Sequence, residues 1–416
     1  MFYRHFKQFS MNNSIKTQLQ QKEFNTLKGR QRVLLQWATG CGKSKMAIDL
    51  INYTVGMLPF DHTYKILFVV AERAHINNWK QEWKKWHLSS KATSEIVCYN
   101  SLHKVDKEYD VIVFDEAHHM FTEKRLGIIE TLKASYIYLL SATLSANKKA
   151  KAESIFGKFT TSTITLNGAI QNSILPDPKV YVVAMELDDK RIKEEIRINK
   201  ANESSPVVDW ENRGKYIYKK KPCIIRCTER QKYLYYTDLM DYWKQRYELS
   251  RNQFHHNIWV NLGSQRKRFL GELKTEAVYR LTDRLAYKRY VCFCASIAQA
   301  TMLSNNAISS KKGDRKNQYI INSFNSKRIN NIYAVGMITE GMNLTDIQVG
   351  IITQLDGKER LFIQKFGRAM RAEDPVAFIF YYKNTQDENY LKKALENIDP
   401  KFVKYTDVKQ LKTIKL

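Results

Sequence analysis

Residues 32–44 read Arg-Val-Leu-Leu-Gln-Trp-Ala-Thr-Gly-Cys-Gly-Lys-Ser, a short apolar run that leads directly into a glycine-rich turn. The run predicts a buried strand, and the residues from Lys43 to about Ile51 predict a helix. Gly40 and Gly42 allow the backbone to curl so that successive N–H groups point inward, toward the positive end of that helix. Together these features predict a cradle for phosphate groups.

The end of this turn carries the side chains that a nucleotide needs. Lys43 is suited to lie against the β- and γ-phosphates, and the Ser44 hydroxyl is suited to ligate Mg²⁺. Thr39 and Cys41 belong to the same turn. The strict phosphate-loop pattern has a glycine where this chain has Trp37, so the match is incomplete. We expect a nucleotide site here; the alternative is an ordinary strand–turn–helix corner that carries a lysine.

The composition indicates a large basic protein. The 416 residues, 44% of them hydrophobic, fit two or three domains, and 68 Lys and Arg against 42 Asp and Glu give a net charge of +26. This surplus predicts a polyanionic partner, nucleic acid rather than membrane. No apolar run approaches the roughly 18 residues that span a bilayer, and the first residues lack the apolar core of a signal peptide. We therefore expect a cytoplasmic protein whose six cysteines, which lack zinc-site spacing, are reduced structural thiols.

Two further polar clusters follow apolar runs. Residues 110–114 lead into Asp-Glu-Ala-His at 115–118, and residues 136–140 lead into Ser-Ala-Thr at 141–143. Short apolar strands separated by helix-length segments predict a parallel α/β sheet, in which ligands gather at the carboxyl ends of the strands. We therefore expect these clusters and the phosphate loop to form one site.

The acidic cluster is suited to ATP hydrolysis. Asp115, at a strand end, is the expected partner of Mg²⁺ together with Ser44. Glu116 is suited to orient and deprotonate the attacking water. The predicted cofactors are ATP and Mg²⁺.

An aromatic and basic helix is predicted after the second apolar strand. Trp79, Trp83 and Trp86 are spaced so that they share one face of this helix. Packing against the core is the favoured interpretation, and stacking on nucleic-acid bases is the alternative.

The rest of the chain predicts a second α/β domain without a phosphate loop. Further strands are expected near residues 291, 332, 350 and 376. Another strand is expected near residue 179, within the segment that we assign to a linker and insertion. The domain boundaries that we expect are 1–165 for the ATP-binding domain, 166–222 for a linker and charged insertion, 223–400 for the second domain with a helical insertion, and 401–416 for a basic tail.

A basic segment late in the chain supplies positive charge. Residues 364–371 read Gln-Lys-Phe-Gly-Arg-Ala-Met-Arg, and on a helix Arg368 and Arg371 share a face. An arginine contributed across a domain interface can accelerate phosphoryl transfer by about 10³ to 10⁵. The alternative is a solvated basic helix.

This ordered set of motifs resembles the motif series of superfamily 2 helicases and translocases. The motifs that carry the resemblance are residues 39–44, 115–118, 141–143, 341–344 and 364–371. The resemblance implies two tandem RecA-like domains, with parallel sheets flanked by helices and ATP in the cleft between them.

The resemblance also implies roles for individual residues. It implies an adenine contact for Gln20, although Gln18 and Gln21 remain alternatives. It implies that a first set of residues contacts the nucleotide or takes part in catalysis: Gly341, Gln364, Arg368 and Arg371. It implies that a second set couples the nucleotide state to nucleic-acid binding: His118, Ser141, Thr143 and Thr339.

Within the superfamily, the details are similar to DNA-directed branches. Asp-Glu-Ala-His at 115–118 and Glu-Gly-Met-Asn-Leu-Thr at 340–345 resemble Swi/Snf-type translocases and the helicase subunits of phage and restriction systems. The favoured function is therefore an ATP hydrolase that moves along or unwinds DNA. The alternatives are an RNA helicase, a nucleic-acid-binding ATP switch, or a motor subunit of a replication, repair or restriction-like complex. Candidate phosphate contacts are Arg266, Lys267, Arg268 and Lys219 to Lys221.

Overall fold

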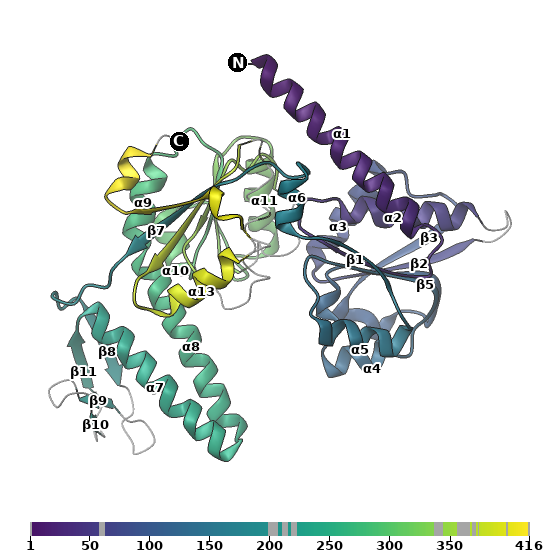
Figure 1. The fold of residues 1–416 in the computed structure, drawn as a ribbon. Helices are drawn as coiled ribbons and strands as arrows, with labels where there is room; N and C mark the ends of the chain where they lie inside the picture. Colours follow the sequence, from purple (N-terminus) through teal and green to yellow (C-terminus); the bar gives the residue numbers. More distant parts are fainter. Residues whose placement is uncertain are drawn as a thin grey trace.

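Two parallel sheets, each covered by helices, make up the body of the molecule (Figure 1). None of the described helices is long and apolar enough to cross a membrane. The computed structural model describes residues 2–57, 63–198, 207–209, 215–217, 223–336, 344–355, 367, 372, 374–396 and 398–414.

The first sheet has the strand order β3-β2-β4-β5-β1-β6, and all of its pairings are parallel. Its strands are β1 (Arg32–Trp37), β2 (Tyr64–Val70), β3 (Ala92–Cys98), β4 (Glu108–Phe114), β5 (Lys133–Ser141) and β6 (Thr160–Ile164). Its helices are α1 (Phe2–Leu27), α2 (Lys43–Gly56), α3 (Arg73–Lys85), α4 (Glu123–Ile129) and α5 (Ala146–Phe156), with 3₁₀ turns at η1 (Tyr99–Lys104) and η2 (Ala117–His119).

Successive side chains of β1 pack on opposite faces of this sheet, as a strand requires. Val33, Leu35 and Trp37 join the core beneath α2 and α3, whereas Leu34 joins the core beneath α4 and α5. Both faces are therefore buried, which explains why the strand reads as a continuous apolar run.

The second sheet has the order β13-β14-β12-β15-β16-β7-β17 and is also parallel throughout. Its strands are β7 (Lys179–Met185), β12 (Tyr290–Phe293), β13 (Ala307–Ile308), β14 (Asn331–Ala334), β15 (Val349–Ile352), β16 (Val376–Tyr382) and β17 (Val403–Asp407). The accompanying helices are α6 (Leu166–Gln171), α9 (Thr275–Asp283), α10 (Ile297–Leu303), α11 (Asp314–Asn325) and α13 (Gln386–Leu395), with turns η4 (Pro400–Phe402) and η5 (Gln410–Thr413).

Two of the expected domain boundaries need correction. The segment 166–222 is not only a linker, because its strand β7 pairs with β16 over seven residues inside the second sheet. The segment 401–416 is not a tail outside the second domain, because its strand β17 pairs with β7 at the edge of the same sheet. Val180, Val182 and Val183 of β7 are fully buried, so this strand is part of the core of the second domain.

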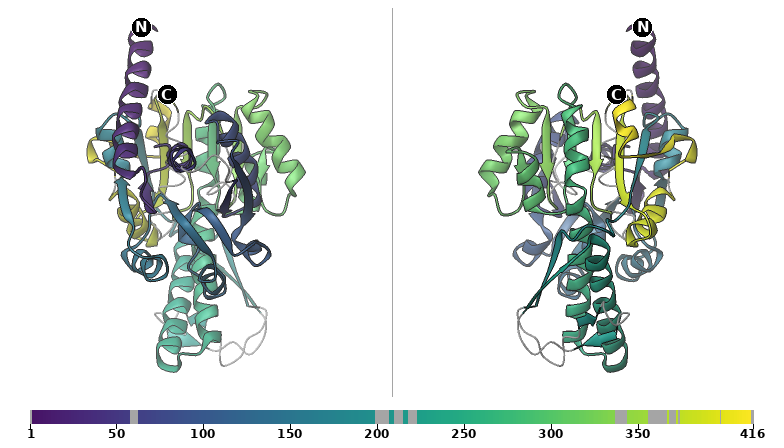
Figure 2. Two further views of the ribbon diagram at one scale, coloured as in Figure 1. Left: turned by 90° about the vertical axis from the view of Figure 1, so that its right-hand side faces the viewer. Right: turned by 90° about the vertical axis from the view of Figure 1, so that its left-hand side faces the viewer.

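An arm projects from the second domain, away from both sheets (Figures 1 and 2). It consists of two antiparallel helices and two small β-ribbons: α7 (Glu229–Ser250), α8 (Gln253–Leu273), β8 (Glu194–Ile198) paired with β11 (Cys223–Cys227), and β9 (Val207–Asp209) paired with β10 (Lys215–Ile217). The start of α7 is fixed by a capping box, in which Thr228 and Gln231 each accept a hydrogen bond from the other's backbone N–H.

A buried ion pair anchors the base of the arm. Lys274 is fully buried, and its Nζ donates to Asp387 Oδ2 and to the Thr353 carbonyl, each at 2.7 Å. Asp387 Oδ2 also accepts from the Tyr382 N–H. Because both charges are out of water, each depends on the other.

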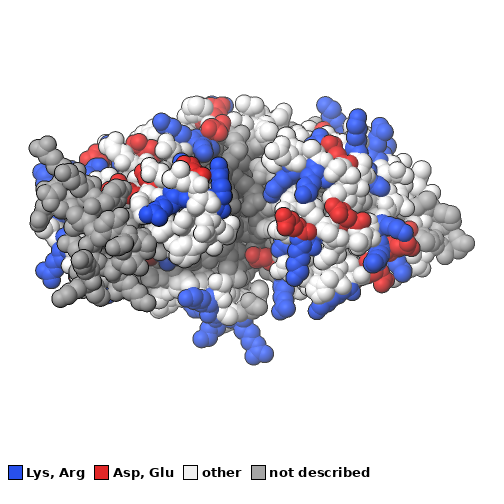
Figure 3. Space-filling model, turned by 90° about the horizontal axis from the view of Figure 1, so that it is seen from below, with Lys and Arg blue, Asp and Glu red and all other residues white. Residues whose placement is uncertain are grey.

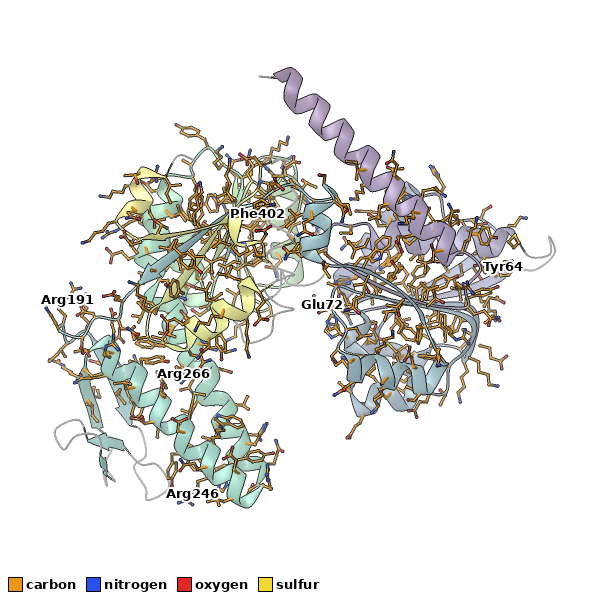
Figure 4. The ribbon with its side chains drawn as sticks, viewed as in Figure 1. Tyr64, Glu72, Arg191, Arg246, Arg266 and Phe402 are labelled. Carbon is orange, nitrogen blue, oxygen red and sulfur yellow. The ribbon has the colours of Figure 1, made fainter. Side chains whose placement is uncertain are left out.

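Arg266 is a second anchor and not a contact for a partner. It is 7% exposed, lies over the Tyr233 ring, and donates to Thr237 Oγ1 at 3.0 Å. Figure 4 shows it where the arm joins the domain, whereas Arg246 lies at the far end of the arm. The expectation that Arg266 contacts nucleic acid is therefore wrong, because its guanidinium group is buried and binds Thr237 and Tyr233 within the fold.

We predict that Lys274→Met lowers the free energy of unfolding by about 3–5 kcal/mol, because it leaves a buried carboxylate without its cation. Urea denaturation followed by circular dichroism measures this. The double variant Lys274→Met with Asp387→Asn should recover part of the loss, since Asn can still accept from Tyr382. Lys244→Met, which removes one partner of an exposed pair with Glu248, is the control and should change stability by less than about 0.5 kcal/mol. If the two lysine substitutions lowered the free energy of unfolding equally, the buried Lys274–Asp387 pair would not be an anchor of the arm.

Candidate nucleotide site

The glycine-rich turn forms a loop between β1 and α2. Gly40 and Gly42 both have φ of +94°, a left-handed conformation that glycine adopts without strain, and Gly42 caps the start of α2. Lys43 Nζ donates to the Trp37 carbonyl at 2.8 Å, so its charge is held over the loop. Burial raises the pKa of the Cys41 thiol, although the nearby charges of Lys43 and Lys16 oppose this. The loop therefore presents one fixed cation, backbone N–H groups and a neutral thiol.

Helix α1 packs directly against this loop. Gln20 Nε2 donates to the Cys41 carbonyl at 2.9 Å, and Lys16 Nζ donates to the Gly40 carbonyl at 2.7 Å. A Cβ at Gly42 would lie 2.3 Å from Gln20 Nε2, so a side chain there would displace this amide from the Cys41 carbonyl. Of the three candidate glutamines, Gln20 is buried, whereas Gln18 and Gln21 are exposed. Lys16 was missed because a lysine in a polar helix gives no specific signal.

Trp37, which breaks the phosphate-loop pattern, has a structural role. Its ring is fully buried, and its Nε1 donates to Ser162 Oγ at 2.7 Å. Ser162 Oγ in turn donates to Glu23 Oε2 of α1 at 2.7 Å. This chain of hydrogen bonds ties α1 to β1 and β6, which keeps Gln20 and Lys16 on the loop.

Asp115 follows β4 and receives several hydrogen bonds. Its Oδ2 accepts from Trp79 Nε1 at 2.9 Å and lies 3.6 Å from His75 Nδ1, and its Oδ1 accepts from the Glu116 N–H at 3.0 Å. Burial by itself would raise the pKa of Asp115, but the contacts with His75 and Trp79 and the charge of Lys43 outweigh it and lower the pKa. Asp115 is therefore a carboxylate, the form that ligates Mg²⁺.

Glu116 connects the acidic cluster to the cluster after β5. Its backbone is left-handed, with φ of +46°, which is uncommon for a residue other than glycine. Its Oε2 lies 3.4 Å from His118 Nδ1, and the same nitrogen lies 3.5 Å from Ser141 Oγ. Ser141 Oγ donates to the Thr143 carbonyl at 2.8 Å. The structure thus brings Glu116, His118, Ser141 and Thr143 together, as their positions after neighbouring strands predict.

The second domain reaches the loop at Gly367. A Cβ at this position would lie 2.8 Å from Thr39 Cβ, closer than non-bonded carbons approach, so only glycine fits. Leu175, just before β7, also touches the loop: its Cδ2 lies 3.2 Å from where a Cβ at Gly40 would be. The predicted site residues Thr339, Gly341, Gln364, Arg368 and Arg371 lie outside the described residues.

The tryptophans of α3 confirm the core-packing interpretation. The ring centroids of Trp79 and Trp83 lie 4.8 and 5.0 Å from the ring centroid of Phe68, and Trp86 packs on the same core. The hydrogen bond from Trp79 to Asp115 was not predicted. His75 and Trp79 lie one helical turn apart on the helix that follows β2, at the sheet edge that carries Asp115. This position in the sequence could have indicated that they contact Asp115.

Two family profiles match the chain in sequence order. The type III restriction enzyme res subunit family matches residues 5–104 and 88–146, and the helicase conserved C-terminal domain matches residues 273–373. The chain belongs to the superfamily 2 helicases and translocases. This membership makes it an ATP-hydrolysing enzyme that acts on nucleic acid, and it confirms the family inferred from the order of the motifs.

Solved structures confirm the superfamily 2 fold of two RecA-like domains. Dbp5 of S. cerevisiae, bound to RNA and ADP BeF3, has a TM-score of 0.56 at 12% identity, with 93% of this chain and 88% of that chain covered. An HsdR fragment of a type I restriction enzyme from Vibrio vulnificus YJ016 scores 0.54 at 13% identity, covering 91% and 65%. The type ISP restriction-modification enzyme LlaBIII, bound to DNA, scores 0.56 at 13% identity, covering 94% and 31%. No curated protein sequence matches this superfamily 2 chain.

We predict that Gly367→Ala slows ATP hydrolysis by at least about tenfold while ATP still binds the first domain, because the added methyl group pushes the second domain off Thr39. Steady-state hydrolysis and equilibrium binding of a fluorescent ATP analogue separate the two effects. Gly127→Ala is the matched control, since a Cβ there meets nothing within 4 Å. Normal hydrolysis by Gly367→Ala would show that this contact is dispensable.

Proposed function

We propose that this chain is a motor that couples ATP hydrolysis between its two RecA-like domains to movement along, or unwinding of, DNA. The observation that carries this proposal is the contact of Gly367, from the second domain, with Thr39 of the phosphate loop in the first. A nucleotide in the loop would therefore lie against both domains, so its hydrolysis can change how the domains meet.

Several described residues carry side chains suited to ATP hydrolysis. Lys43 and the N–H groups at the start of α2 would hold the phosphates, and Ser44 and Asp115 would hold Mg²⁺. When bound, Mg²⁺ neutralises charge on the phosphates. Glu116 would orient the attacking water and accept its proton. Gln20 and Lys16 keep the loop in shape through the carbonyls of Cys41 and Gly40.

The remaining catalytic residues are proposed from the resemblance to the superfamily. In the sequence, Arg368 comes directly after Gly367, the residue that touches the loop. We propose that Arg368 and Arg371 stabilise the negative charge that develops on the transferring phosphoryl group. Gln364, Gly341 and Thr339 would complete the nucleotide and coupling contacts of the second domain.

A basic surface supports a nucleic-acid partner. The net charge is +26, and on one face Lys and Arg side chains stand on both sides of the furrow between the two halves, with Asp and Glu among them (Figure 3). Lys267 and Arg268 remain candidate phosphate contacts, because they are more exposed than Arg266. Affinity that rests on such contacts should fall steeply with salt.

DNA is favoured over RNA by the family match. Residues 5–146 match the res subunit of type III restriction enzymes, and LlaBIII, of similar fold, is described as bound to DNA. An RNA helicase is the second candidate, because Dbp5 and Mss116p, also of similar fold, are described as bound to RNA. A role as the motor subunit of a larger assembly is favoured by coverage: the chain spans 31% of LlaBIII and 65% of the HsdR fragment.

We predict that double-stranded or single-stranded DNA stimulates ATP hydrolysis more than RNA of the same length does. Steady-state hydrolysis with each polynucleotide measures this. Glu116→Gln should retain ATP binding and lose at least about 100-fold in turnover, since it removes the base. Lys43→Ala should weaken both binding and turnover.

Lys45→Ala is the matched control for Lys43. Lys45 lies two residues further along α2, where it pairs with Asp49 at 2.6 Å, so its loss should leave turnover close to wild type. Unchanged turnover in Lys43→Ala and Glu116→Gln would refute the site. Stronger stimulation by RNA would favour the RNA helicase, and hydrolysis without strand or triplex displacement would favour a switch.

A further inference from the structure

Helix α3 holds the Asp115 carboxylate through the indole of Trp79. The Nε1 of Trp79 donates to Oδ2 at 2.9 Å, and His75, one turn earlier on α3, places its Nδ1 3.6 Å from the same oxygen. Trp79 is 2% exposed, and its ring lies against Phe68 of β2. The donor is therefore fixed by packing and cannot follow a carboxylate that rotates away.

The other carboxylate oxygen stays available. A carboxylate oxygen accepts about two hydrogen bonds or metal bonds, and Oδ1 accepts from the Glu116 N–H at 3.0 Å. A bond from α3 to Oδ2 and a bond from the backbone to Oδ1 fix the plane of the group. They leave on Oδ1 a lone pair for a cation.

We propose that Trp79 is a positioning residue, which orients the Asp115 carboxylate to receive the Mg²⁺ of bound ATP. This inference rests on the proposed function, in which Asp115 holds that ion. Groups in the second coordination shell of a metal commonly change its affinity by about 10- to 100-fold when they are removed.

The same helix provides the control. Trp83 stands one turn beyond Trp79, and its ring lies 5.0 Å from that of Phe68, compared with 4.8 Å for Trp79. Its buried Nε1 has no hydrogen-bond partner among the described residues. Trp79→Phe and Trp83→Phe thus remove similar ring volume beside Phe68, from a buried side chain and a partly buried one, but only the first removes a hydrogen bond to Asp115.

Equilibrium binding of a fluorescent ATP analogue, with Mg²⁺ and with EDTA, tests the proposal in the full-length chain. We expect Trp79→Phe to raise the Kd roughly tenfold in Mg²⁺ and to leave it unchanged in EDTA, whereas Trp83→Phe matches the wild type in both. Equal behaviour of the two variants, or an equal loss with and without Mg²⁺, would overturn the inference.

Asp115→Asn separates this inference from the proposed function. If Asp115→Asn abolishes the Mg²⁺ dependence of binding and Trp79→Phe does not alter it, the inference about Trp79 fails alone. If Asp115→Asn also leaves the dependence intact, the assignment of the metal site fails with it.

A measurement on the wild-type side chain covers the case in which Trp79→Phe does not fold. In spectra of ¹⁵N-labelled protein, the indole N–H resonance assigned to Trp79 should shift when Mg²⁺ is added to the ATP-bound protein. It should stay in place when Mg²⁺ is added without ATP. Indole resonances that do not respond to Mg²⁺ in the ATP-bound protein would contradict the proposal.

Discussion

The partly buried carboxylate of Asp115 is the group on which the arrangement of the first domain depends. Removing a carboxylate from water is costly unless hydrogen bonds and nearby cations compensate, and here the compensation comes from several elements. The α3 helix supplies Trp79 and His75, the backbone supplies the Glu116 N–H, and the phosphate loop supplies the charge of Lys43. These contacts lower the pKa of Asp115, so the group contributes stability at neutral pH, which is lost as the pH falls through its folded pKa.

The phosphate loop is likewise held by contacts from three parts of the chain. Gln20 and Lys16 of α1 bind its carbonyls, Leu175 touches it just before the chain enters β7, and Gly367 of the second domain packs on Thr39. The path from Trp37 through Ser162 to Glu23 keeps α1 in position. A loop held by both domains is well placed to transmit the presence of a phosphate from one domain to the other.

The sequence predicted the elements whose signal is local. Apolar runs predicted the inner strands of both parallel sheets but not the edge strands β3, β6, β13 and β17. Polar residues after those runs predicted the cluster of Glu116, His118 and Ser141. It did not predict contacts between residues distant in the chain. Trp79 has the spacing of a core residue and is one, and only the fold reveals that its N–H reaches Asp115. Arg266 and β7 were misassigned for the same reason. Each is buried by an element distant in the sequence, and the neighbouring residues in the sequence do not indicate such burial.

An experimental structure with a non-hydrolysable ATP analogue and Mg²⁺ tests the shared site most directly. We expect the triphosphate in the loop between β1 and α2, Mg²⁺ bound by Ser44 and by Asp115 Oδ1 directly or through water, and Gly367 still against Thr39. Trp79 Nε1 should remain hydrogen-bonded to Asp115 Oδ2. A nucleotide bound elsewhere, or one held by the first domain with the second domain detached from the loop, would contradict a site shared by the two domains.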